Sequence, residues 1–316
     1  MTPDELALAL QLAQVSGAAY EKNEDLDPQR CPCKATLSDI RILTAGQHEI
    51  DAVLLAVAGD RQIIAFRGTL PPMDIKNLRN PRSVIRDWLN NTNADLAARD
   101  GFQGKVHPGF TKSFNGLLQN GLQTAVDEAV TKKLKLQFTG HSKGGALATL
   151  AAYHFRKQGL PVDVVMTFGS AQVGDDQFRA EYELLGLRHE RFEHAHDIVP
   201  SEPEIGVPGV ALIPPRPDYR HVGKLRYLNT QGELDSRNDD SALKSERRAE
   251  RDRRLALLND MFVGVMGLSE IIPLLADHAI DPFHPDQSVL RKTLAMLGIS
   301  KLKLTSYAEV LERLCQ

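Results

Sequence analysis

Apolar residues along the first part of this chain change their spacing from strand-like to helix-like. Apolar runs separated by Gly, Asp and Gln turn signals predict strands within residues 35–45, 49–59 and 61–69. From residue 107 to residue 135 the spacing becomes helical, with one stripe of large side chains at Phe110, Phe114, Leu117, Leu118 and Leu122. This stripe predicts a helix.

Strands and helices then alternate through the middle of the chain. The pattern predicts strand, helix, strand and helix at residues 134–138, 142–158, 162–169 and 175–186, with strand-like alternation again at 188–200 and 219–230. The strand runs are too uniformly apolar for a sheet with one wet face. We therefore expect an α/β fold, a mostly parallel central sheet with helices on both faces.

Length and charge limit the classes of function. The 316 residues fit one large α/β domain, and the net charge of −3 gives no general attraction to nucleic acid. The composition shifts only at residues 236–254, which are dense in both signs of charge. We interpret this segment as a solvated insertion at about residues 230–255, with a partner or anionic-surface contact as the alternative.

The chain begins with a pattern typical of an ordinary capped helix. Thr2, Pro3 and Glu5 occupy the positions of an N-cap, a first-turn proline and a capping-box acid. No basic region precedes the apolar positions, so we expect a cytoplasmic protein, with export by a signal-independent route left open. The most apolar late stretch is interrupted by Glu270 and Pro273, so no transmembrane segment is predicted.

The chain has three cysteines, Cys31, Cys33 and Cys315, which is not a disulfide framework. Cys31-Pro-Cys33 is one residue short of the CxxC spacing of metal and redox pairs. We interpret these residues as ordinary loop thiols and expect no metal and no cofactor.

The segment Gly140-His141-Ser142-Lys143-Gly144 carries the clearest chemistry. It fits the G-x-S-x-G nucleophile elbow between an apolar strand and a helix rich in small residues. Small neighbours at 140 and 144 suit a serine held at a strained turn, whereas a plain helix cap needs neither glycine. We predict Ser142 as a nucleophile.

A serine nucleophile of this kind needs two backbone donors for the oxyanion. The N–H of Lys143, the residue after the nucleophile, is one. Thr69, which follows Gly68 at the end of an earlier predicted strand, is expected to supply the other.

Together these blocks resemble the class 3 lipases, the fungal-lipase-like branch of the α/β-hydrolases. The motifs are AFRGT, DWLNN, VHPGF, FTGHSKGGALATLAA, FGSAQVGDDQF and HDIVP, over roughly residues 60–225, with a further likeness near residue 278. In that family the residue at His141 packs under the elbow. Lys143 is a departure, since the family usually has leucine there, and we expect a more basic or more exposed site.

The resemblance also implies the acid of a triad. Triad residues in α/β-hydrolases follow the chain order Ser, Asp, His, and Asp197 precedes Ile-Val-Pro as the family's acid does. Its expected role is to orient the imidazole and stabilise the imidazolium. Asp175 and Asp176 open a predicted helix, where carboxylates cap well.

The base is chosen among the histidines that follow Asp197 in the chain, His221, His278 and His284. His278 matches the family's Asp-His segment, and a loop after the last strand can reach the sheet's carboxyl edge. We therefore predict His278. His221, inside a strand-like stretch, is the second choice.

The predicted function is hydrolysis of lipid esters such as acylglycerols through an acyl-enzyme. A phospholipase A or a soluble-ester esterase with the same triad is the main alternative. An acyltransferase, a thioesterase and a catalytically silent binding module are further ones. Because neutral His278 must accept the Ser142 proton, hydrolysis is expected to weaken below about pH 6.5.

A short helix after Thr69 suggests contact with lipid. Ile85, Trp88 and Leu89 form an apolar stripe at helical spacing. In the family a helix at this place is a lid, so transient contact with a lipid interface is expected. Packing of Trp88 in the core is an equal alternative.

Overall fold

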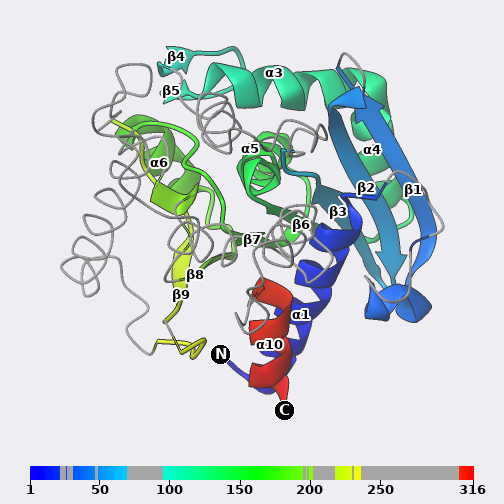
Figure 1. Ribbon diagram of the computed structural model, residues 1–316. Coiled ribbons are helices and arrows are strands. Elements are labelled where there is room, and N and C mark those ends of the chain that lie inside the picture. The colour runs from blue at the N-terminus through cyan, green and yellow to red at the C-terminus, as the bar shows by residue number, and fades with distance from the viewer. Residues whose placement is uncertain are drawn as a thin grey trace, which may run out of the picture.

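The computed structural model describes residues 1–21, 26, 31–46, 49–69, 95–194, 197, 199–201, 218–229, 231–235 and 306–316. Within these residues a seven-stranded sheet has the order β1-β2-β3-β6-β7-β8-β9, as Figure 1 shows. Its strands are Ser38–Ala45, Asp51–Ala58, Arg61–Phe66, Lys135–His141, Val162–Phe168, His189–His194 and Lys224–Leu228. A small ribbon pairs β4 (Ala97–Ala98) with β5 (Lys105–Val106).

The sheet is mostly parallel. β1, β2 and β3 are antiparallel neighbours, whereas β3, β6, β7, β8 and β9 pair in parallel. The predicted mostly parallel central sheet is confirmed. Because parallel strands place their carboxyl ends at one edge, the loops after β3, β6 and β8 open at the same end of the sheet.

Helices cover both faces of the sheet because its central strands are apolar on both sides. Ile64 and Phe66 of β3 pack into the core with the helices α3 (Pro108–Leu117), α4 (Gln123–Thr131), α5 (Lys143–Lys157) and α6 (Asp176–Leu184). Ile63 and Ala65, which point the other way, pack with α1 (Pro3–Ala18) and α10 (Tyr307–Cys315). Figure 1 shows α1 and α10 side by side.

The amino-terminal helix α1 has the predicted start. The Thr2 hydroxyl accepts from the N–H of Glu5 at 3.2 Å, and the Glu5 carboxylate accepts from the N–H of Thr2 at 2.8 Å. This reciprocal capping box satisfies two N–H groups that a helix start otherwise leaves without partners.

The helix predicted over residues 107–135 is divided in two. A π-type turn, η4 (Leu118–Leu122), separates α3 from α4, and Gly121 within it has φ 107°. The Asn120 side chain donates to the carbonyl oxygen of Gly116 at 2.9 Å. Asn-Gly is a turn signal that the apolar stripe concealed. The stripe is real, since Phe110, Phe114, Leu117 and Leu122 are all buried.

Candidate active site

Ser142 occupies a strained corner between β6 and α5. Its backbone has φ 58° and ψ −130°, a sparsely populated conformation for a residue with a Cβ that costs about 1–3 kcal/mol. Ser142 stands at the N-cap position of α5, yet its side chain makes no capping bond. The strain therefore serves something other than the helix start, and it is typical of a nucleophile elbow.

The glycines at 140 and 144 allow close packing around this corner. A Cβ on Gly140 would lie 2.3 Å from the carbonyl oxygen of Gly144, and a Cβ on Gly144 would lie 2.1 Å from the carbonyl oxygen of Phe66. Neither atom could be accommodated without moving backbone. β3, β6 and α5 can approach one another to this extent only with glycine at both positions.

The two residues predicted to bind the oxyanion follow neighbouring strands. Parallel pairing of β3 with β6 places Phe66 beside Gly140, and Thr69 and Lys143 each come three residues later. Both therefore emerge at the same edge of the sheet. Lys143 opens α5, so its N–H lies in the first turn, where backbone donors have no partner within the helix.

The Lys143 side chain is held in an ion pair. Its Nζ lies 2.6 Å from Oδ1 of Asp51 and 3.5 Å from Oγ of Ser113. The Lys143 and Asp51 side chains are only 15% and 8% exposed. The expectation of a more basic or more exposed site is wrong, because the carboxylate at the start of β2 balances the ammonium and the core encloses both.

His141 lies buried beneath the elbow, where its Nδ1 is 2.8 Å from the hydroxyl oxygen of Tyr20. Tyr20 follows the end of α1, so the amino-terminal helix contributes directly to the support of the residue before Ser142.

Asp197 is buried after the end of β8. Its Oδ1 accepts from the N–H of Val199 at 2.9 Å, and its Oδ2 accepts from the hydroxyl of Tyr307 at 2.7 Å. The Tyr307 oxygen in turn accepts from the N–H of His194 at 2.9 Å. Two donors thus fix both carboxylate oxygens at the sheet edge that also carries Ser142.

His221 makes two close contacts through one ring nitrogen. Its Nε2 lies 2.5 Å from the carbonyl oxygen of Pro200 and 3.4 Å from Oε1 of Glu193. Because a carbonyl oxygen only accepts, Nε2 carries the proton in this bond. His221 also precedes β9, which begins at Lys224, so its expected place inside a strand is wrong.

Several predicted residues lie outside the described part of the chain, so their places are not given by the structure. They are His278, His284, the lid residues Ile85, Trp88 and Leu89, and the charged segment 236–254.

Three supporting residues were not anticipated from the sequence: Tyr20, Asp51 and Tyr307. Tyr20 and Tyr307 lie 121 and 110 positions from the residues they contact. Local motifs hold no signal for such distant pairs. Lys143 was the one clue to Asp51, because a lysine enclosed beside the elbow requires an acidic partner.

None of the helices in the described ranges is long and apolar enough to cross a bilayer.

Comparison with known families and curated proteins identifies related chains. Residues 63–206 match the family described as Lipase (class 3). The secreted mono- and diacylglycerol lipase 1 of Fusarium solani is 38% identical over 128 residues, which cover 38% of this chain and 37% of the relative. The chloroplastic phospholipase A(1) DAD1 of Arabidopsis thaliana is 29% identical over 158 residues, covering 48% and 34%. The chain thus spans about a third of the length of these two relatives.

Solved structures extend the likeness of fold. The Rhizomucor miehei triacylglyceride lipase has a TM-score of 0.59 at 20% identity, covering 77% of this chain and 91% of that one. A triacylglycerol lipase described as having a serine protease triad as its catalytic centre has a TM-score of 0.58 at 21% identity, covering 77% and 91%. The predicted resemblance is confirmed at the level of family segment and fold.

The expected cytoplasmic location is wrong. The relatives are named as secreted in Fusarium solani and as chloroplastic in Arabidopsis thaliana. The expectation rested on the composition of the first residues, which does not determine the compartment in which a hydrolase of this fold acts.

Proposed function

Because the chain has a class 3 lipase-like α/β-hydrolase fold, we propose that it is a serine hydrolase of carboxylic esters. One observation carries the proposal above the others. Ser142 is held at φ 58° at a strand-to-helix corner without serving as a cap. The buried Asp197, at the same edge of the sheet, supplies the carboxylate that a triad requires.

The proposed reaction proceeds through an acyl-enzyme. His278 takes the Ser142 proton as the serine oxygen attacks the ester carbonyl, and the N–H groups of Lys143 and Thr69 stabilise the resulting oxyanion. His278 then protonates the leaving alcohol. Water, activated by the same imidazole, attacks the acyl group, so that the acid is released and Ser142 regains its proton. Asp197 holds the imidazole in the required tautomer.

The proposed substrates are acylglycerol-type lipid esters. A mono- and diacylglycerol lipase and triacylglycerol lipases are among the proteins similar to this chain. Phospholipid esters are the second candidate, because several curated relatives are named phospholipase A1. A series of p-nitrophenyl esters of increasing chain length, followed by diacylglycerol and phosphatidylcholine, would separate these substrate classes.

Contact with a lipid interface is part of the proposal. Ile85, Trp88 and Leu89 are proposed as the apolar face of a lid that turns toward lipid. The check is the rate on dispersed ester against the rate on dissolved ester. No preference for the dispersed form would remove the lid from the proposal.

We further propose that the chain is one hydrolase domain with a charged insertion at about residues 230–255. Support comes from α1 and α10, at opposite ends of the chain, which pack into the same core against one face of the sheet.

The decisive experiment compares four proteins on a p-nitrophenyl ester. Ser142→Ala and His278→Ala are each expected to lose several orders of magnitude in kcat, whereas His221→Ala stays within about tenfold of the parent. A fluorophosphonate probe should label the parent at Ser142 and leave Ser142→Ala unlabelled. An unlabelled parent would favour a binding module, and a greater loss at His221 than at His278 would reverse the assignment of the base.

A further inference from the structure

The thiols of Cys31 and Cys33 are in direct contact. Their sulfur atoms lie 3.1 Å apart, on the short helical turn η1 (Pro32–Thr36) and the residue before it. The turn is fixed by its own bonds, since the N–H of Lys34 donates to the Cys31 carbonyl at 2.8 Å and the Thr36 hydroxyl donates to the Cys33 carbonyl at 2.7 Å. The contact is therefore built into a defined backbone rather than into two loose side chains.

The two thiols differ in acidity. The hydrogen bond from the Cys31 thiol lowers the pKa of Cys33, while the same bond, together with burial, raises the pKa of Cys31. Cys31 consequently keeps its proton and Cys33 is the thiol that ionises more readily. The thiolate is the reactive form of cysteine, so the two sulfurs have different roles available to them.

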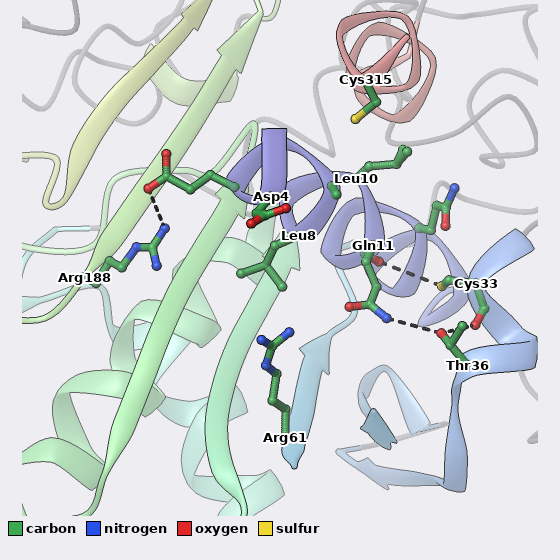
Figure 2. A pocket seen from close by; sticks show the side chains of 12 residues that line it. Asp4, Leu8, Leu10, Gln11, Cys33, Thr36, Arg61, Arg188 and Cys315 are labelled. Atoms are coloured by element: carbon green, nitrogen blue, oxygen red, sulfur yellow. Dashed lines mark hydrogen bonds and ion pairs between the residues drawn. The ribbon is translucent and has the colours of Figure 1, made fainter. Parts of the chain in front are cut away.

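Access from solvent follows the same asymmetry. Cys31 is 0% exposed, whereas Cys33 is only partly buried. Cys33 lines a surface pocket of about 670 Å³ beside α1, together with Gln11, Thr36 and Arg61, and Figure 2 shows it from close by. Cys33 therefore borders a pocket that is open to solvent, whereas the fully buried Cys31 does not line it.

From this arrangement we propose that Cys31 and Cys33 form a redox-active dithiol that hydroperoxides oxidise to an intrachain disulfide. The Cys33 thiolate attacks one peroxide oxygen, the O–O bond breaks, and Cys33 becomes a sulfenic acid as hydroxide leaves. The Cys31 sulfur then attacks the Cys33 sulfur, an S–S bond forms, and the sulfenic oxygen leaves with the Cys31 proton as water. Two electrons pass from the thiols to the peroxide.

Little movement is required for the second step. The two sulfurs must approach by about 1 Å to reach the length of a disulfide bond. The proposal goes beyond the interpretation of this pair as ordinary loop thiols, and the experiment below decides between the two.

The chain contains an internal standard for the test. Cys315, at the end of α10, lines the same pocket but is exposed, and burial followed by the nearby Glu312 carboxylate raises its pKa. Figure 2 places it on a different element from Cys33. The rate at which Cys315 is oxidised serves as the reference rate for a thiol of this protein outside the Cys31–Cys33 pair.

The experiment treats the full-length folded protein with hydrogen peroxide, blocks remaining thiols with N-ethylmaleimide and identifies tryptic peptides by mass. Trypsin releases both cysteines in one peptide, Cys-Pro-Cys-Lys, residues 31–34. We expect this peptide to become lighter by two hydrogens, roughly tenfold faster than Cys315 is oxidised, and to be restored by dithiothreitol. In Cys31→Ser, dimedone should trap a sulfenic acid at Cys33.

Two results would overturn the proposal. One is a Cys-Pro-Cys-Lys peptide that remains alkylated on both sulfurs while Cys315 is oxidised. The other is a disulfide that forms only between separate chains. A Cys315→Ser variant removes the third thiol and should leave the oxidation of the pair unchanged. The readout is a mass, so the result does not depend on ester hydrolysis.

Discussion

At the scale of single residues, the ion pair beside Ser142 gives the sharpest test of how this strand-to-helix corner is held. Lys143 and Asp51 are both almost enclosed, at 15% and 8% exposure. Removal of one partner leaves the other charge buried and unpaired, which typically costs about 3 kcal/mol. Lys143→Leu and Asp51→Asn should each lower the free energy of unfolding by about that amount. The double variant should lose about 2 kcal/mol less than the sum of the two single losses.

Urea unfolding of the four proteins measures this coupling, and the chain offers a matched exposed pair. Arg179 and Glu183 lie 2.9 Å apart at 47% and 55% exposure. A surface pair of this kind should couple by less than about 0.5 kcal/mol. Equal coupling free energies at the two pairs would show that enclosure does not strengthen the Lys143–Asp51 ion pair.

Tyr307 is the second residue whose role can be isolated. Its hydroxyl donates to the proposed catalytic carboxylate of Asp197 at 2.7 Å, and hydrogen bonds to charged groups are worth about 1.5–3 kcal/mol. Tyr307→Phe keeps the packed ring and removes this donor. We expect kcat to fall by roughly tenfold, with KM within about twofold, because the carboxylate then orients the imidazole less well.

A matched buried tyrosine separates positioning from stability. The hydroxyl oxygen of Tyr182, on α6, lies 2.9 Å from Nδ1 of His189. Tyr182→Phe should lower the unfolding free energy without changing kcat. If both variants changed kcat equally, Tyr307 would be a structural residue only.

At the scale of elements, the elbow depends on the contact between α5 and β3. Gly144→Ala would place a Cβ 2.1 Å from the Phe66 carbonyl oxygen, whereas Gly116→Ala, within α3, would meet only the Cβ of Ala45 at an ordinary 3.4 Å. We expect Gly144→Ala to lower the unfolding free energy by several kcal/mol and abolish hydrolysis. Gly116→Ala should be neutral or stabilising by up to about 1 kcal/mol. Thermal unfolding and ester hydrolysis measure both.

The elements themselves were largely predictable because their patterns are local. β2 and β3 are near-continuous apolar runs, and α1 carries its complete cap within its first residues. The division of the helix at Gly121 was missed because an amphipathic stripe survives a π-type turn. The Asn120-Gly121 pair was the available signal, and the periodicity outweighed it.

At the scale of the whole molecule, the site was predictable only where a motif carries it. The elbow could be predicted because strand, glycines and helix are adjacent in the chain. The support from Tyr20 and Tyr307 could not be predicted, because these residues lie 121 and 110 positions from the residues that they contact and reach the site only through the fold. A motif thus predicts the groups proposed to react, and the fold decides which residues hold them.

Stability of the whole molecule against acid is expected to depend on His189. Its ring is buried between the Tyr182 hydroxyl and the Thr167 hydroxyl, and burial, followed by the nearby Arg191 charge, lowers its pKa from 6.5 to about 3. Between these two values the unfolded chain binds a proton at His189 that the folded chain does not. The unfolding free energy contributed by this group therefore falls as the pH falls from about 6.5 toward 3.

The size of this effect follows from linkage. One proton taken up on unfolding changes stability by about 1.4 kcal/mol per pH unit. Urea unfolding gives the free energy of unfolding of the parent and of His189→Gln at each pH between 7 and 4. Below about pH 6 this free energy should change less steeply with pH in the variant, whatever constant loss the substitution causes. Parallel slopes would mean that His189 is protonated in the folded chain.

The proposed loss of hydrolysis below about pH 6.5 has a different origin, the protonation of His278, and should persist in His189→Gln as a fall in kcat/KM of the folded enzyme.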